Sequence, residues 1–420
     1  MTDVAKLVEE RAKGRDAILQ FALEYKAKRE NALSGENEEE LKNRLEAIRK
    51  NSITNLSALK SRAIASLAAN GFVVHEAKNA EEAVEKAKEA IGKEKLIVKS
   101  KSNTLDEIKI EEALEGREVV ETDLGDFMNQ VAGNKDMHPV MPALNLTPRD
   151  MANAIREKFK EVVEAKPEAI AGFAREYLRE KLIKAKVGIS GANAVTAQGN
   201  VIMLENEGNI SLVSRMPDTH IIVVGIDRIV ENVEEAMHVA KCSAIWGTGQ
   251  KWTSYVSVIS GPSKTADVQN KLVVGAQGAK EVHIILLDNG RTQMINEGFG
   301  ELLQCIGCGA CLNFCPAFHQ VQNGFGCDAL GGIKGVVTQM FRKGKQAAFE
   351  CGAFYCLTCL SCKFNCPAKI GFGKYLLKTR ELLVKEGLEP EASKKMAEKA
   401  KATGNPFGSS SENPKELYCC

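Results

Sequence analysis

The sequence from residue 305 to residue 316 reads Cys305-Ile-Gly-Cys308-Gly-Ala-Cys311-Leu-Asn-Phe-Cys315-Pro316. The same spacing returns at residues 356–367, which read Cys356-Leu-Thr-Cys359-Leu-Ser-Cys362-Lys-Phe-Asn-Cys366-Pro367. Each copy separates its four cysteines by two, two and three residues and ends in a proline. The proline fixes φ, so the cysteine loop stops where the chain must turn.

This spacing is how bacterial ferredoxins bind [4Fe–4S] clusters, and the fourth cysteine of each run ligates the other cluster. We therefore expect two [4Fe–4S] clusters that carry electrons singly. The small residues Gly307 and Gly309 should let backbone N–H groups approach the ligand sulfurs. The predicted ligands are Cys305, Cys308, Cys311 and Cys366 for cluster 1, and Cys356, Cys359, Cys362 and Cys315 for cluster 2.

Zinc and disulfides are the alternatives for so many cysteines. Structural zinc sites usually pair two C-x₂-C knuckles, which these runs match poorly. Disulfides are not expected, because nothing in the sequence is typical of a secreted protein. We interpret Cys242, Cys327 and Cys351 as buried free thiols. For Cys419 and Cys420, metal binding in a partner, redox activity and an exposed tail without a role stay open.

Length and charge exclude several classes of protein. A chain of 420 residues predicts two or three domains. The 56 basic and 55 acidic residues nearly cancel, so we expect no nucleic-acid partner. The longest apolar stretches, such as 221–224 and 284–287, are too short to span a membrane, and the N-terminus lacks a signal-peptide layout. We expect a cytoplasmic protein of a reducing, anaerobic metabolism.

Four regions follow one another along the chain. Residues 1–68 are predicted to form a helical arm, broken near residues 34–37, that packs on the main domain or docks a partner. Residues 69–293 alternate strands and helices, which predicts an α/β domain with a mainly parallel sheet. Residues 294–390 should form an all-helical two-cluster domain, because the insert between the runs is long. Residues 391–420 are predicted to be a flexible tail.

Strand ends carry the candidate ligand-binding residues of the α/β domain. Parallel sheets bind ligands beyond the carboxyl ends of their strands. Lysines and hydroxyls there suit an anion such as a carboxylate or phosphate. An alternative is that these polar residues only form turns and caps. No motif identifies a catalytic residue, and His220 and His283 are interpreted as structural. The candidates are Lys99, Ser100, Lys101, Asn193, Glu207, Asn209, Ser260, Ser263 and Asp267.

Several of these stretches resemble a known family. Gly188-Ile-Ser-Gly-Ala-Asn193, Ser260-Gly-Pro-Ser-Lys-Thr-Ala-Asp267 and Leu286-Leu-Asp-Asn-Gly-Arg291 are similar to the LUD (lactate utilization) domain. With the two cysteine runs, residues 70–385 resemble the lactate utilization protein B family. The resemblance implies a sheet related to sugar-phosphate isomerases and CoA transferases. It also implies a complex that oxidises L-lactate to pyruvate, with a cysteine-rich CCG-type subunit and sometimes a second LUD subunit.

Three functions are compatible with these features. The first is an electron-transfer subunit that relays single electrons between a flavin-containing or CCG-type subunit and an acceptor. The second is a self-contained enzyme whose LUD domain binds a small anionic metabolite while the clusters drain its electrons. The third is a redox-sensing or assembly scaffold. The second cysteine run is also similar to the small iron–sulfur subunit of heterodisulfide reductases.

Overall fold

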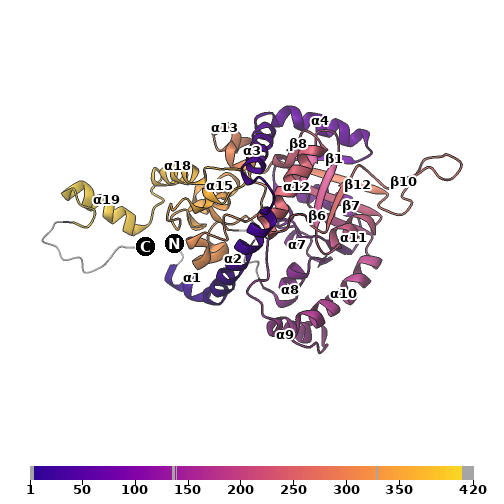
Figure 1. Ribbon diagram of the computed structural model, residues 1–420, viewed down its shortest axis with the longest axis horizontal. Coiled ribbons are helices and arrows are strands. Elements are labelled where there is room, and N and C mark those ends of the chain that lie inside the picture. The colour runs from indigo at the N-terminus through magenta and orange to yellow at the C-terminus, as the bar shows by residue number, and fades with distance from the viewer. Residues whose placement is uncertain (1–3, 135–137, 139, 328–329, 409–420) are drawn as a thin grey trace.

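The computed structural model describes residues 4–134, 138, 140–327 and 330–408 (Figure 1). Cys419 and Cys420 lie outside these residues. Helices come first along the chain, an α/β region follows, and a helical region completes the described part. None of the described helices is long and apolar enough to cross a membrane.

A six-stranded, entirely parallel sheet forms the centre of the α/β region, as predicted. Buried β-branched and leucine side chains on its inner strands favour this arrangement. His220 and His283 are paired within it: Ser190 Oγ lies 2.8 Å from His220 Nε2, and His75 Nε2 lies 3.1 Å from His283 Nδ1. In spatial order the strands are β1 (Val73–Ala77), β12 (Glu281–Leu287), β7 (Thr219–Gly225), β4 (Val187–Ser190), β2 (Leu96–Lys99) and β3 (Glu118–Glu121).

A second, mixed sheet packs beside the first. Not every strand of residues 69–293 joins the parallel sheet, because β6 pairs antiparallel with β5 and β9. The cause is the short turn over residues 197–200, because two parallel strands need a crossover of about a dozen residues. The order is β8 (Ile229–Val230), β5 (Ala194–Thr196), β6 (Val201–Glu205) and β9 (Tyr255–Ile259), and a separate hairpin joins β10 (Lys264–Thr265) to β11 (Val273–Val274).

Helices cover both faces of the parallel sheet. Along β7, Ile222 and Val224 pack in the core with α4 (Leu56–Ala69) and the second sheet. Ile221 and Val223 pack on the opposite face with α5 (Ala80–Ile91). The alternation of strand side chains therefore fills two cores at once. Further helices are α6 (Asn103–Glu107), α7 (Ile110–Ala113), α8 (Leu124–Ala132), α9 (Pro148–Phe159), α10 (Pro167–Lys184), α11 (Asn209–Arg215), η1 (Ile226–Arg228) and α12 (Val233–Thr248).

The N-terminal helices share one core with the cysteine-rich region. They are α1 (Val4–Glu10), α2 (Ala12–Leu33) and α3 (Glu38–Thr54), and Asn37 caps α3 by accepting from the Glu40 N–H. Leu45 is fully buried in a cluster that also contains Trp246 of α12 and Phe318 of the cysteine-rich region. Figure 1 shows these indigo helices beside the orange helices of that region. The arm is therefore an integral part of the structure around the cysteine runs.

The cysteine-rich region is all-helical, as predicted. It contains α13 (Arg291–Asn296), η2 (Gly300–Gln304), α14 (Pro316–Val321), η3 (Gln322–Gly324), α15 (Gly332–Lys343), α16 (Lys345–Glu350), α17 (Ser361–Phe364) and α18 (Phe372–Val384). Where a flexible tail was predicted, α19 (Glu391–Thr403) forms, and none of its residues is buried. Its sequence is rich in Ala, Lys and Glu, which favour helix without needing a packed face.

One cysteine prediction is wrong. Cys327 and Cys351 form a disulfide rather than two free thiols, with their Cα atoms 5.3 Å apart. The pairing follows from a backbone contact in which the Gly326 N–H donates to the Cys351 carbonyl at 2.9 Å. This contact brings the end of α16 beside the turn that precedes α15. Cys242 is a buried free thiol, as predicted.

Candidate iron–sulfur centre and adjoining cavity

The two cysteine runs face one another across a single cavity of about 50 Å³. Cysteines of both runs line it, together with the first residues of α15 and α18. The lining cysteines are Cys305, Cys311, Cys315, Cys356, Cys359 and Cys362. Runs that are far apart in the sequence therefore present their thiols to a common space.

The fourth cysteine of each run lies with the opposite run. The Cys366 thiol interacts electrostatically with those of Cys305 and Cys308. Cys315 has the corresponding interaction with Cys356 and Cys362. This is the proximity that crossed ligation requires, and it supports the predicted ligand sets.

The backbone of the two loops repeats as closely as their sequences do. Gly307 and Thr358 occupy the same place in the two runs, with φ of +77° and +54°. Their N–H groups donate to Cys305 Sγ and Cys356 Sγ, each at 3.3 Å. The Gly307 contact confirms the expected approach of its N–H to a ligand sulfur. A threonine in the left-handed region costs about 1 kcal/mol, so the second loop accepts strain that glycine spares the first.

Burial makes these thiols poor acids on their own. It raises the pKa of Cys308 to about 12 and that of Cys362 to about 11. Thiolate ligands therefore form here only where cations offset their charge, as cluster iron does. Eight soft sulfur donors with N–H groups aimed at them suit [4Fe–4S] clusters.

Arg49 anchors the approach to the first cysteine. It extends from α3 and is 1% exposed. Its guanidinium donates to the carbonyls of Leu303 at 2.8 Å and Gln304 at 3.2 Å, directly before Cys305, and to that of Asp227. Sequence reasoning missed this residue, because an arginine in a charge-rich helical arm has no local signal that distinguishes it from a solvated one.

A larger cavity of about 310 Å³ lies at the carboxyl edge of the parallel sheet. Strands β2 and β4 end at this edge, and the loops that follow them line the cavity. Its far wall is the first cysteine loop, residues 306–308. Of the nine predicted ligand-binding residues, the structure brings together Ser100, Lys101, Asn193, Glu207 and Asn209.

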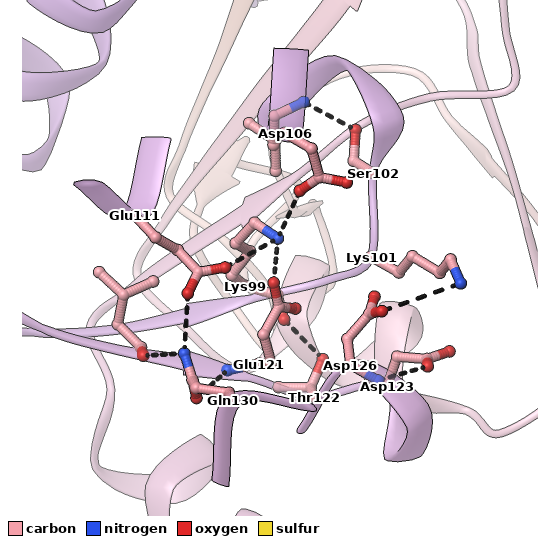
Figure 2. Close-up of polar contacts among 12 residues, drawn as sticks. Lys99, Lys101, Ser102, Asp106, Glu111, Glu121, Thr122, Asp123, Asp126 and Gln130 are labelled. Carbon is pink, nitrogen blue, oxygen red and sulfur yellow. Dashed lines mark hydrogen bonds and ion pairs between the residues drawn. The ribbon is translucent and has the colours of Figure 1, made fainter. Parts of the chain in front are cut away.

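Lys99 does not line this cavity. It is 1% exposed, and its ammonium lies among three carboxylates (Figure 2). Glu121 is its nearest partner, and Asp106 and Glu111 each lie 3.4 Å away. Burial works to lower the pKa of Lys99, but these carboxylates hold it well above its usual value. Lys99 therefore fastens α6 and α7 to the sheet rather than facing a ligand.

The third predicted segment also lies elsewhere. Ser260 Oγ donates to Asn200 Oδ1 at 2.7 Å, and Asp267 Oδ2 accepts from Thr265 Oγ1 at 2.9 Å. Ser263 is fixed through its backbone N–H, which donates to the Ala279 carbonyl at 2.9 Å. These residues form the base and arm of the β10–β11 hairpin, which projects from the α/β region in Figure 1.

The cavity combines cations with a titratable carboxyl. Lys101 Nζ donates to the Val140 carbonyl at 3.1 Å and lies 3.9 Å from Asp126. Glu207 Oε2 accepts from the Leu124 N–H at 3.1 Å. Partial burial and the neighbouring Asp123 carboxylate raise the pKa of Glu207 to about 7. A carboxyl that titrates near neutrality can hold or release a proton in this space.

Arg228 connects the cavity to the first cysteine loop. It follows β7 at the same carboxyl edge and lines the cavity. A Cβ on Gly307 would lie 3.3 Å from its Nη2, so the guanidinium lies close against the loop and a side chain at residue 307 would have to displace it slightly. Sequence reasoning missed Arg228, although its place directly after a buried strand was a usable signal.

Comparison with known proteins accounts for both halves of this arrangement. The LUD domain model matches residues 60–287, and the 4Fe-4S dicluster domain model matches residues 301–370. Lactate utilization protein B of Bacillus pumilus is 36% identical over 359 residues, which cover 83% of this chain and 73% of the relative. The chain belongs to the lactate utilization protein B family.

Other members of the lactate utilization protein B family match to a similar extent. Those of Bacillus subtilis and Macrococcus caseolyticus are 35% and 33% identical, and each comparison covers 88% of this chain and 76% of the relative. A DUF162 family protein from Deinococcus radiodurans is a solved structure with 14% identity and a TM-score of 0.30, over 55% of this chain and 98% of that one. As a family member with a dicluster domain, this chain binds two [4Fe–4S] clusters.

Proposed function

We propose that this chain is the electron-transfer subunit of a multi-subunit oxidoreductase that oxidises lactate or a related hydroxy acid. The relatives' name and the two clusters support the proposal. The observation that carries it is that both cysteine runs line one cavity and lie between two different surroundings. Cys308 of the first run lines the cavity of about 310 Å³ at the sheet edge (the LUD cavity), and Cys359 of the second run is exposed.

The outer end is suited to a protein partner. Exposed apolar side chains surround the second run: Leu357 is 61% exposed, Leu360 45% and Phe364 74%. Apolar surface beside an exposed cluster ligand lets a partner approach closely and exclude water. A flavin-containing or CCG-type subunit docked here would exchange single electrons with cluster 2, and cluster 1 would connect to the LUD side.

The test is EPR spectroscopy of the anaerobically purified, full-length chain. We expect no reduced-cluster signal after addition of L-lactate alone, and a signal after dithionite, because the subunit needs its partner to deliver electrons. Absence of a signal after dithionite, with full iron and sulfide content, would refute the relay. A signal from L-lactate alone would favour the second candidate over the first.

The second candidate is a self-contained enzyme, favoured by the contact between the LUD cavity and the first cysteine loop. Lys101 and Arg228 offer positive charge to a carboxylate, and Glu207 is placed to exchange a proton. Oxidation of L-lactate to pyruvate releases two electrons and two protons. Two one-electron clusters match the electrons. The fraction of the complex in which Glu207 is ionised can take one proton on that carboxylate, and solvent can take the other.

Binding of L-lactate, measured by calorimetry, tests this candidate. Affinity should fall as pH rises through 7, because Glu207 then ionises and repels the anion. Glu207→Gln should flatten that dependence, and Lys101→Met should abolish binding. Lys264→Met, an exposed lysine on the hairpin outside the cavity, is the matched control and should bind as the unsubstituted chain does. If the affinity for L-lactate changes neither in Lys101→Met nor with pH, this cavity is not the binding site.

A further inference from the structure

Lys334 is a buried cation that faces the iron–sulfur centre. It lies in the first turn of α15 and is 8% exposed. It lines the cavity shared by the two cysteine runs, together with Cys305. Among the residues that the structure describes, none forms an ion pair or hydrogen bond with its ammonium group. A buried charge without a partner is costly, so its place in this cavity calls for an anion.

The surroundings of Lys334 are already rich in positive charge. A second, small cavity that Lys334 also lines is bordered, among described residues, by three arginines and two carboxylates. The two carboxylates are engaged by arginines: Asp227 lies 2.5 Å from Arg291, and Glu107 lies 2.9 Å from Arg291 and 2.8 Å from Arg342. The two carboxylates therefore do not offset all of the positive charge around Lys334.

We propose that Lys334 selectively raises the reduction potential of cluster 1, an inference that rests on the proposed relay and its ligand sets. A [4Fe–4S] cluster with four thiolates is an anion, and reduction adds one more negative charge. A cation beside Cys305 therefore stabilises the reduced form more than the oxidised form. The effect is strong in a buried site, where water does not screen the charge.

Cluster 2 has a different environment. Arg380 interacts electrostatically with Cys356, and its guanidinium donates to the carbonyls of Ala353 at 2.8 Å and Cys356 at 2.7 Å. Cys359 is exposed, so solvent reaches this cluster and screens nearby charge. Removal of the Lys334 charge should therefore affect the two clusters unequally.

The test is an EPR-monitored redox titration of the full-length, cluster-loaded chain, with dithionite as reductant. Lys334→Met should lower the midpoint potential of cluster 1 by at least about 59 mV, which is a tenfold change for a one-electron couple. Lys334→Arg keeps the positive charge, so the midpoint potential of its cluster 1 should differ from that of the unsubstituted chain by less than that margin. Repeating the titrations in a Cys359→Ser background, which removes a ligand of cluster 2 only, identifies the signal of cluster 1.

Lys363→Met is the matched control, because Lys363 is exposed and directly follows a ligand of cluster 2. It should shift neither potential by that margin. An unchanged cluster 1 potential in Lys334→Met, or equal shifts of both clusters, overturns the proposal. If Lys334→Met loses iron, Lys334→Gln is titrated in its place. If both neutral variants lose iron, the charge of Lys334 is needed to hold cluster 1 in the protein, and the proposal that it tunes the potential is overturned. Neither lactate nor a partner enters the titration, so its outcome is independent of the proposed function's test.

Discussion

Arg49 belongs to a helix with many solvated charges, yet its guanidinium is buried. It donates to three carbonyl oxygens, one at Asp227 before β12 and two in η2 after β12. Carbonyls at the end of a short 3₁₀ helix have no partner within that helix. The arginine supplies the missing donors to η2, which leads into Cys305. A single side chain of the N-terminal arm thus fixes where the first cluster loop begins.

Arg49→Met should lower the free energy of unfolding by about 3 kcal/mol, because three carbonyls lose a charged donor. The change is measured by anaerobic urea unfolding, followed through the visible absorbance of the clusters. Arg44→Met is the control on the same helix. Arg44 pairs with Glu234 at 2.6 Å in solvent, and its loss should cost under about 1 kcal/mol. Equal effects of the two substitutions would show that Arg49 has no anchoring role.

At the scale of elements, the two cysteine loops are near-copies. Corresponding residues are left-handed in both: Gly307 with Thr358, and Gly309 with Leu360, where φ is +73° and +64°. Each loop is followed by a helix or turn that starts at its proline, so the fourth cysteine is directed away from its own run. The geometry of each loop is thus set locally, whereas the predicted fourth ligand of each cluster comes from the opposite loop.

Crossed ligation, as predicted from the spacing, would make Cys315 a ligand of the second cluster. Cys315→Ser should therefore change the EPR signal that Cys356→Ser changes, and leave intact the signal that Cys305→Ser changes. Spectra of the three dithionite-reduced variants, each with its iron content determined, decide the matter. If Cys315→Ser instead reproduced the spectrum of Cys305→Ser, each run would hold its own cluster.

At the scale of the whole molecule, buried ion pairs join the LUD region to the cluster region. Glu107 of α6 is held between Arg291 of α13 and Arg342 of α15. Burial works to raise the pKa of Glu107, but the two arginines hold it below its usual value of 4.5. These pairs keep the LUD cavity against the first cysteine loop, which both candidate functions need.

Glu107→Gln should destabilise the cluster-loaded chain by roughly 3 kcal/mol at pH 7, because both arginines lose a buried partner. The lowered pKa of Glu107 means that its contribution is present above pH 4.5 and is lost as pH falls through the folded value. The difference in free energy of unfolding between the unsubstituted chain and Glu107→Gln should therefore become smaller in acid. Anaerobic urea unfolding at pH 7 and pH 4 measures it, with the exposed Glu112→Gln as control. A difference in unfolding free energy that does not change with pH would contradict a stabilising role of the ionised Glu107.

The sequence by itself determined the cofactor, the parallel sheet and five of the residues that line the LUD cavity. A local pattern suffices to find these features, because each depends on residues that are close in the sequence. Examples are the spacing of the cysteines, the alternation along strands and the polar residues that follow a strand, such as Lys101. Only the tertiary structure decided that Lys99 pairs with carboxylates, that Cys327 meets Cys351, and that Arg49, Arg228 and Lys334 gather at the first cluster loop. Those contacts join separate elements of the fold and depend on how these pack together. Apart from the place of Arg228 after a buried strand, no single stretch carries a signal for them.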